Sequence, residues 1–362
     1  MMPRPTSLAW MFVALSAPVC LAAHPIPEAE RWATITHPGN AAYQSDPSSI
    51  YGRPVGSVDY EYQISRTEVT GAEWFEFVQA YGRYIDTNHD NDTEFTSGAI
   101  VRTGPGTYIL HPLAANRSID VGWRYAARYC NWLHNGKADT PEAFERGVYD
   151  SSTFGDVFTP TSIGFTDQVA HSPDARYWLP TIDEWVKAAH FDPNRYGEGQ
   201  PGYWTYSTSS DEPPIPGPVE LGGQTSAAWP IFGALRPEVA AYRDVQSPWG
   251  LWDTSGGERE WTESAAIGIG KPLPEGRWVD GTSWRDPVWS IESLDRIDGL
   301  GAPYPANHFG IRLARAVPGA GCTSAVVCAI LHLTRRRRRP HETASNHRLH
   351  SGSHVACGSG TG

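Results

Sequence analysis

The segment from Tyr177 to Ala189 reads YWLPTIDEWVKAA and gives the clearest local prediction in the sequence. Thr181 and Glu184 form a capping box, in which the threonine hydroxyl and the glutamate carboxylate bond the first backbone amides of a helix. A short apolar face of tryptophan and alanine follows, and Asp192-Pro193 ends the helix because proline cannot continue it. We therefore predict a short buried helix here, entered from an extended segment.

Two further helices are predicted earlier in the chain. Thr70 and Glu73 repeat the capping box before apolar residues with helical spacing, which predicts a helix from about Gly71 to Tyr81. Asp120 is placed to cap a helix from about Val121 to His134, which ends at an Asn-Gly pair.

The remaining segments predict short strands and turns. Glu61–Val69 and Asn307–Ala316 alternate as strands do, and Ser247–Thr262 and Arg277–Trp284 combine aromatic residues with glycines, as short strands and tight turns do. The chain holds 36 Gly and 30 Pro, which favours long loops over a helical bundle. The sequence therefore predicts a loop-rich α+β fold with few short helices and strands.

Composition sets two limits on function. Hydrophobic residues make up 40% of the chain and aromatic residues 12%, which is enough for a large core and argues against a disordered protein. Between His24 and Val317 there are 22 basic and 39 acidic residues. A domain this acidic repels phosphate backbones, which argues against nucleic-acid binding.

Residues 1–23 have the plan of a secretory signal peptide. Arg4 precedes an apolar run from Leu8 to Ala17, and Ala22-Ala23 supplies small residues for cleavage. The mature chain is expected to begin at about His24. We expect the protein to be exported to the periplasm, the outer surface or the extracellular matrix.

Residues 317–339 have the plan of a sorting signal. A mostly apolar stretch, Val317–Leu333, precedes five arginines, Arg335–Arg339. This order resembles the PEP-CTERM signals of exported proteins of Gram-negative bacteria, although Gly319 stands where that signature has glutamate. The resemblance implies export and sorting machinery as partners, and transient attachment to the membrane through the C-terminus. It also implies an inner-membrane-anchored precursor, with the arginines on the cytoplasmic side.

The final segment, residues 340–362, is polar and is expected to be disordered. Soft-metal binding by His350, His354 and Cys357 is the alternative.

Cys130 is the single cysteine between the two end segments, so no disulfide is expected within the domain. It shares helical spacing with apolar neighbours, which indicates a small hydrophobic side chain on a core face. A catalytic cysteine is the alternative.

Several segments together resemble the formylglycine-generating enzyme family, also called the sulfatase-modifying factor domain, a variant of the C-type lectin fold. The Leu-Pro-Thr-x-x-Glu-Trp element at Leu179–Trp185 is the most specific of them. The resemblance implies one domain over residues 57–316, after an N-terminal lead-in over residues 24–56. Together with both chain ends, it resembles a group of exported bacterial members. The segments are Tyr62–Glu76, Val121–Leu133, Tyr177–Ala189, Ser247–Thr262, Gly281–Trp284 and Phe309–Ala314.

The resemblance also implies a copper site whose ligands this sequence lacks. In the family's enzymes, two cysteines after the Gly-Gly-Ser motif bind copper and activate oxygen, which converts a sulfatase cysteine to formylglycine. Counting from Ser283, those positions fall on Asp286 and Ile291. Neither residue offers the soft thiolate that Cu(I) prefers. We therefore expect no copper and a pseudoenzyme.

An enzyme that uses other groups is the alternative. Ser283, Arg285, Asp286, His308 and Arg312 are candidates for a polar pocket where the family's active site lies. Charged residues also gather in ordinary ion-pair clusters, which is the simpler interpretation.

Calcium is the ion that the resemblance favours. Family members bind it in the turn that here runs from Asp253 to Glu260, through side chains at those two positions and backbone carbonyls at Gly256 and Glu258. Hard oxygen ligands around a glycine turn suit calcium, and a solvated acidic turn is the alternative.

A second acidic loop, Asp86–Glu94, begins like an EF-hand. It has Asn91 where the EF-hand has glycine and Ser97 where the bidentate glutamate belongs. An exposed acidic loop is therefore the expected structure, with calcium binding as the alternative.

The leading hypothesis is an exported, non-catalytic binding domain at the cell surface or in a matrix, with a glycan or a protein as ligand. Trp204, Tyr206, Trp229 and Trp249 are candidate rings for stacking on sugars. An enzyme and a structural matrix component without a specific ligand are the alternatives.

Overall fold

The structure is a computed structural model of the chain. It describes residues 26–45, 53–158, 163–227, 237–266, 273, 274, 276–287, 290–294, 300, 301 and 309–318. The chain divides into two compact units, Met1–Val317 and Pro318–Gly362, and all described residues except Pro318 lie in the first. Among these residues, no helix has the length and apolar character needed to cross a membrane. The predicted signal peptide, the predicted sorting signal after Pro318 and the polar tail with His350, His354 and Cys357 lie outside the described residues, as do His308 and Trp229.

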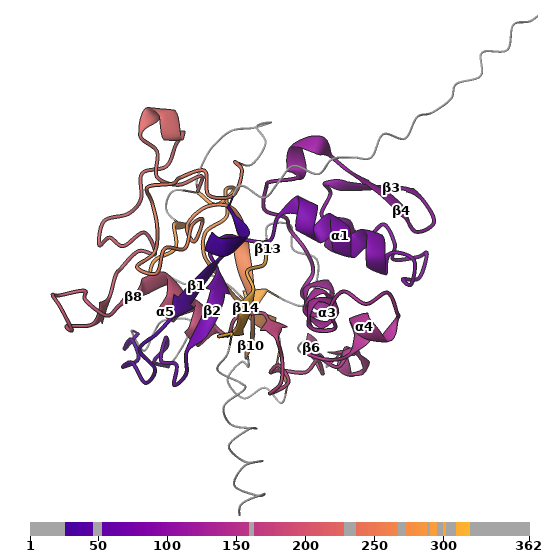
Figure 1. Cartoon of the computed structure of the whole chain (residues 1–362), viewed down its shortest axis with the longest axis horizontal. Helices are drawn as coiled ribbons and strands as arrows, with labels where there is room; N and C mark the ends of the chain where they lie inside the picture. The colour runs from indigo at the N-terminus through magenta and orange to yellow at the C-terminus, as the bar shows by residue number, and fades with distance from the viewer. Residues whose placement is uncertain are drawn as a thin grey trace, which may run out of the picture. The chain divides into compact units, whose positions relative to one another are not determined.

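An antiparallel sheet joins strands from both ends of the first unit (Figure 1). Ala314 lies opposite Ile64 on one side and opposite Trp178 on the other, so the last strand is an inner strand of the sheet. In spatial order the strands are β1 (Trp32–Ile35), β2 (Tyr62–Ser65), β14 (Ala314–Ala316) and β7 (Tyr177–Trp178).

A second sheet is built around the long strand β10. It pairs antiparallel with β11 across a bulge between Trp261 and Ala265, and parallel with β13. In spatial order the strands are β12 (Leu300–Gly301), β11 (Gly276–Asp280), β10 (Arg259–Ala266) and β13 (Phe309–Gly310). Three separate hairpins are β3 (Ile100–Gly104) with β4 (Thr107–Leu110), β5 (Asp156–Phe158) with β6 (Ile163–Phe165), and β8 (Phe191–Asp192) with β9 (Gly202–Tyr203).

The helices are short, and the two capping boxes are present. The side chain of Thr70 accepts a hydrogen bond from the Glu73 amide at 3.4 Å, and that of Thr181 accepts one from the Glu184 amide at 3.0 Å. In Figure 1, α1 and α3 lie on the same side as the β3–β4 hairpin, and α5 contacts β10 and β11. The helices are α1 (Gly71–Tyr81), α2 (Thr93–Thr96), α3 (Trp123–His134), α4 (Glu142–Glu145) and α5 (Ile182–His190). The 3-10 turns are η1 (Glu28–Glu30), η2 (Pro112–Ala114), η3 (Ser151–Thr153) and η4 (Val219–Leu221).

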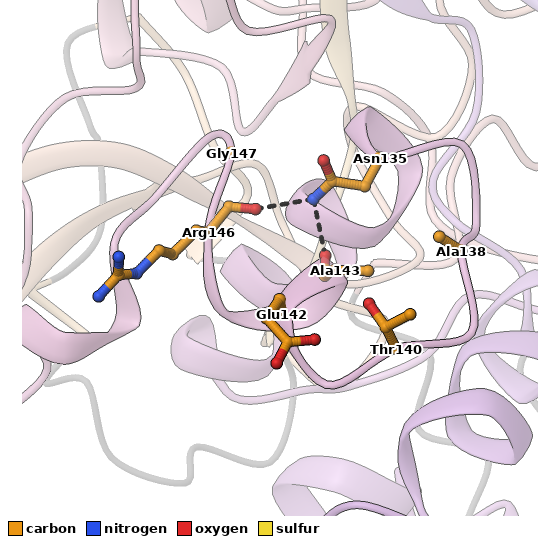
Figure 2. Close-up of a pocket in the computed structure, with 7 residues that line it drawn as sticks. All are labelled: Asn135, Ala138, Thr140, Glu142, Ala143, Arg146 and Gly147. Carbon is orange, nitrogen blue, oxygen red and sulfur yellow. Dashed lines mark hydrogen bonds between the residues drawn. The ribbon is translucent and has the colours of Figure 1, made fainter.

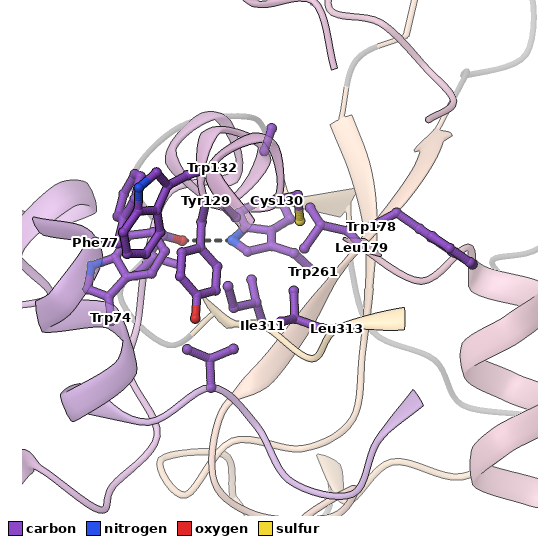
Figure 3. Close-up of a cluster of buried hydrophobic side chains, with 14 of the residues drawn as sticks. Trp74, Phe77, Tyr129, Cys130, Trp132, Trp178, Leu179, Trp261, Ile311 and Leu313 are labelled. Carbon is purple, nitrogen blue, oxygen red and sulfur yellow. Dashed lines mark hydrogen bonds between the residues drawn. The ribbon is translucent and has the colours of Figure 1, made fainter. Parts of the chain in front are cut away.

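The main core is rich in aromatic rings from α1 and α3 (Figure 3). The ring centroids of Trp74 and Phe77 are 4.8 Å apart, and those of Trp74 and Tyr129 are 5.3 Å apart. Cys130 is fully buried in this core, and burial raises the pKa of its thiol well above the usual value. The interpretation of Cys130 as a small core side chain is confirmed, because a buried, protonated thiol is a poor nucleophile.

Helix α3 begins at Trp123, two residues later than predicted, and its N-cap is Gly122. Asp120 is not the cap; its amide donates a hydrogen bond to the hydroxyl of Ser97 at 3.3 Å. The Glu94 carboxylate lies so close to Gly122 that a Cβ there would be 2.3 Å from its Oε2 atom. The Glu94 side chain of α2 therefore occupies the space that a side chain at position 122 would enter, a contact that the local sequence pattern does not indicate.

Both long strands predicted from alternation are shorter in the structure. Of Glu61–Val69, only Tyr62–Ser65 form β2. The Val69 amide bonds the Ile311 carbonyl, but this hydrogen bond belongs to no strand pair. Of Asn307–Ala316, the first part is β13 and the last is β14, and these belong to different sheets. The alternation marks a segment that crosses from one sheet to the other. The loop-rich α+β class itself is confirmed.

Candidate functional site

Arg312 lies in the core rather than in a pocket. Its Nη2 atom is 2.7 Å from Oε1 of Glu260, and its Nε atom is 2.9 Å from Oε2. The same guanidinium donates to the backbone carbonyls of Ser65 and Trp252, both at 2.8 Å. Every one of these groups is buried, so Arg312 ties β10 to β2 and to the loop before β10, and the structure does not bring it together with Asp286.

Asp286 closes the turn that follows β11. It accepts two hydrogen bonds from Arg259, at 2.8 and 3.0 Å, and one from the Ser283 amide at 2.6 Å. Its neighbour Arg285 is exposed and lies over the ring of Trp284 at 4.6 Å. Ile291 is a buried core residue. The carboxylate at the first copper-ligand position is therefore part of an ion pair, and the side chain at the second is an alkyl group.

The predicted calcium turn uses its carboxylates in other ways. Oδ2 of the half-buried Asp253 accepts a hydrogen bond from the Ala240 amide at 2.5 Å, and desolvation of the carboxylate raises the pKa of Asp253 to about 6. Both oxygens of Glu260 bond Arg312, and Oε2 also accepts from the Trp185 indole at 2.7 Å. Glu260 therefore does not fit a calcium ion while Arg312 holds it, and calcium at this turn stays a prediction.

The neighbouring Glu258 also has defined contacts. Its amide donates to Oε1 of the buried Glu68 at 2.7 Å, and its Oε1 accepts from the Trp284 indole at 3.2 Å. In the part of the chain that the structure describes, no three His, Cys, Asp or Glu side chains lie so that they could hold a metal ion.

The acidic loop Asp86–Glu94 bonds mostly to itself and to the hairpin that follows. Asp86 accepts from the Asn88 amide at 3.0 Å, and His89 lies 3.0 Å from Asp92. Asp90 is buried against Arg102 of β3. The loop is thus only partly exposed, and calcium binding there stays a prediction.

A hollow of about 480 Å³ lies beside the β3–β4 hairpin, and we call it the hairpin hollow. Its walls come from α2, the start of β3, η2, the segment after η2, and Arg285. Because Arg285 directly precedes Asp286, the hollow lies next to the first position that the resemblance assigns to a copper-binding cysteine. Among the predicted pocket residues, Arg285 is the one that lines it.

The lining of the hairpin hollow combines apolar and charged side chains. Val101 and Leu113 are each 54% exposed there, and Ile109, the β-ladder partner of Val101, extends the apolar surface with the same exposure. Arg117 and Asp120 add charges of opposite sign, and burial lowers the pKa of Arg117. No local pattern in the sequence indicates this site, because its residues form no motif and come together only through the fold.

A second hollow, of about 410 Å³, lies between the end of α3 and α4 (Figure 2). The amide of Asn135 points across it and donates to the carbonyls of Ala143 at 3.0 Å and Arg146 at 2.7 Å. Asn135 therefore closes the chain turn here, and Ala138, Thr140 and Glu142 also line the hollow.

The rings proposed for sugar stacking differ in access. The guanidinium of Arg195 lies 3.4 Å from the ring centroid of Trp204, and the Trp204 indole donates to Asp192 at 3.1 Å. One face of Trp204 is thus covered by the protein itself. Trp249 is partly buried against the main core, and Tyr206 is half-buried.

Comparison with known proteins gives one family. Residues 27–317 match the sulfatase-modifying factor enzyme 1-like domain. No curated protein matches the chain. Similar solved structures include Treponema denticola variable protein 1, at 19% identity and a TM-score of 0.44, covering 79% of this chain and 95% of that one. CarF is similar at 17% identity and a TM-score of 0.44, covering 79% of this chain and 98% of its own. PvdO from Pseudomonas aeruginosa is similar at 14% identity and a TM-score of 0.44, covering 79% of this chain and 94% of its own.

Proposed function

The chain belongs to the sulfatase-modifying factor enzyme 1-like domain family, and on this premise we propose that it is a non-catalytic binding domain with that fold. The proposal depends mainly on one observation, the chemistry at the two positions that the resemblance assigns to copper-binding cysteines. Asp286 there is paired with Arg259, and Ile291 is buried in the core.

These two side chains do not fit a copper ion. Cu(I) prefers thiolates, and a carboxylate held by an arginine is both a hard ligand and already neutralised. The described cysteine, Cys130, is fully buried, and burial keeps its thiol protonated. The described residues at the two assigned positions therefore lack the thiolates through which the family's oxidases act on a substrate thiol.

Binding is the function that the rest of the surface supports. The hairpin hollow is large enough for a small ligand or for a side chain of a partner, and exposed apolar residues border it. Its place beside Asp286 suggests that the region where the family's enzymes carry out their chemistry here serves recognition alone.

The two chain ends support a place of action outside the cytoplasm. The signal-peptide plan of residues 1–23 supports export, and residues 317–339 support a membrane-held precursor that is released on sorting. The proposed ligand is accordingly an extracellular one.

The test is an oxidation assay on the purified protein. Protein reconstituted with Cu(I) is mixed with a cysteine-containing sulfatase peptide under oxygen, and formylglycine is measured by mass spectrometry. We expect the same result as in a metal-free control. Copper-dependent turnover would overturn the non-catalytic assignment. The Asp286→Cys/Ile291→Cys double variant is the matched control, since it places thiols at both ligand positions and should show higher copper retention than the native chain.

A further inference from the structure

The lining of the hairpin hollow holds more basic than acidic side chains, although the domain as a whole is acidic and Glu238 lies near Arg117. The described lining holds two arginines, Arg117 and Arg285, and one carboxylate, Asp120. Between His24 and Val317 the chain carries 22 basic and 39 acidic residues, so two arginines around one hollow run against the charge of the whole domain. Such a local reversal attracts anions that the surrounding surface repels.

Arginine also sets the kind of anion. Its planar guanidinium donates two parallel hydrogen bonds to a carboxylate, which gives geometric selection as well as charge. The hydroxyl groups of Thr93, Ser97 and Ser118 line the same hollow and add short polar contacts for an oxygen-bearing ligand.

The apolar part of the lining limits the ligand further. Val101 and Leu113 each keep 54% of their surface exposed, which costs free energy that a bound apolar group would recover. No Phe, Tyr or Trp side chain belongs to the lining of this hollow in the described residues, and the ring that does line it is the imidazole of His111. The hollow therefore lacks the large aromatic faces on which neutral sugars stack.

We propose that the hairpin hollow binds a carboxylate that carries a short apolar group beside it, with Arg117 and Arg285 facing the carboxylate and Val101 and Leu113 facing the apolar group. This proposal rests on the proposed binding function and names the ligand chemistry of its site. A free amphipathic acid and the C-terminal residue of a peptide share this chemistry.

The probes are N-acetyl-leucine, its amide, N-acetyl-glycine and the tripeptide Gly-Gly-Leu, titrated into the full-length protein by calorimetry. N-acetyl-leucine should bind about tenfold more tightly than its amide, because the amide loses a charge-assisted hydrogen bond. Removing the apolar group, in N-acetyl-glycine, should also weaken binding. Tighter binding of Gly-Gly-Leu than of N-acetyl-leucine would identify a peptide end as the source, and the reverse would identify a free acid.

Two variants test the assignment to this hollow. Arg285→Gln removes the charge of an exposed side chain and should weaken the binding of N-acetyl-leucine by about tenfold. Leu113→Ser should weaken the binding of N-acetyl-leucine but leave the affinity for N-acetyl-glycine unchanged. The matched controls are Arg83→Gln and Leu221→Ser, which are exposed elsewhere and should change nothing. Thermal unfolding of each variant shows that it is folded.

The proposal fails if the acid and the amide bind equally, if none of the probes binds, or if Arg285→Gln binds as the native protein does. These outcomes differ from failure of the proposed function. Copper-dependent oxidation would remove the binding-domain assignment itself. If the protein binds a glycan or another protein and Arg285→Gln does not weaken that binding, the binding-domain assignment holds but the site lies outside the hairpin hollow.

Discussion

Glu260 and Arg312 form an ion pair sealed inside the protein, with 2.7 Å between Oε1 and Nη2 and at most 1% of either side chain exposed. Glu260 belongs to β10, and Arg312 lies between β13 and β14, where it also bonds the backbone of β2. One charged pair therefore connects the two sheets. The carboxylates of Glu68 and Asp253 also act on this guanidinium, so it balances more than one buried acid.

Replacing Arg312 with methionine should destabilise the domain by about 3 to 5 kcal/mol, because Glu260 is left as a buried charge without its partner. The free energy of unfolding is measured by urea titration. Arg83→Met is the control, since Arg83 pairs with Asp139 in an exposed ion pair, where about 0 to 1 kcal/mol is expected. Equal effects of the two substitutions would show that the buried pair contributes no more than a surface one.

Glu94 should make stability depend on pH near neutrality. Burial, and then the nearby Asp92 carboxylate, raise the pKa of Glu94 to about 7 in the folded chain. Between the unfolded value, about 4.3, and about 7, the folded state binds more protons than the unfolded state, so stability falls as pH rises through this window.

Glu94→Gln should remove that fall in stability. Between pH 4.5 and pH 8, the free energy of unfolding of the variant should rise relative to that of the native protein by about 1 kcal/mol, a value discounted for the partial exposure of Glu94. Melting temperatures at a series of pH values measure it. Glu198→Gln, at an exposed position, is the control. If Glu94→Gln follows the native curve at every pH, Glu94 does not titrate in this range.

Calcium and Arg312 compete for the same carboxylate if the predicted turn binds calcium through Glu260. Calcium should therefore restore part of the stability lost in Arg312→Met. It should raise the melting temperature of the native protein by less than it raises that of Arg312→Met. A hundredfold excess over Kd stabilises by about 2.7 kcal/mol. If a variant that also carries Asp253→Asn responds to calcium equally, calcium does not bind at this turn. The Asp86–Glu94 loop would then be the next place to test.

Export should depend on both chain ends. A tagged protein should give a membrane-bound precursor and a smaller extracytoplasmic product on fractionation. Changing Arg335–Arg339 to serine should weaken retention, because arginines beside an apolar segment resist translocation. A product found only in the cytoplasm, or release that ignores both ends, would refute the sorting model.

Local signals in the sequence were sufficient for the helices. The capping boxes at Thr70 and Thr181 are contacts between residues three positions apart, so the sequence pattern itself shows which residues bond each other. Helix α1 spans Gly71–Tyr81 as predicted. The predicted start of α3 was wrong because Asp120 is not the cap: its amide bonds the hydroxyl of Ser97, and the helix begins after Gly122.

The site depended on contacts that no local pattern contains. Arg312 and Glu260 are 52 residues apart, and the hairpin hollow joins residues near 100 to Arg285. The resemblance placed Arg285 and Asp286 in one predicted pocket. In the structure Arg285 is exposed and lines the hollow, whereas the carboxylate of Asp286 is paired with Arg259, and a site role for either residue stays a prediction.

The position of β14 sets the order in which the domain is completed. This strand, Ala314–Ala316, lies between β2 and β7, so the sheet lacks an inner member until the end of the first unit is free to pair. While a ribosome or a translocation pore still holds these residues, β2 and β7 have no common neighbour, and the long-range pairing that closes the sheet comes last. We therefore expect closure of this sheet to be a late event in folding, which follows the release of Ala314–Ala316.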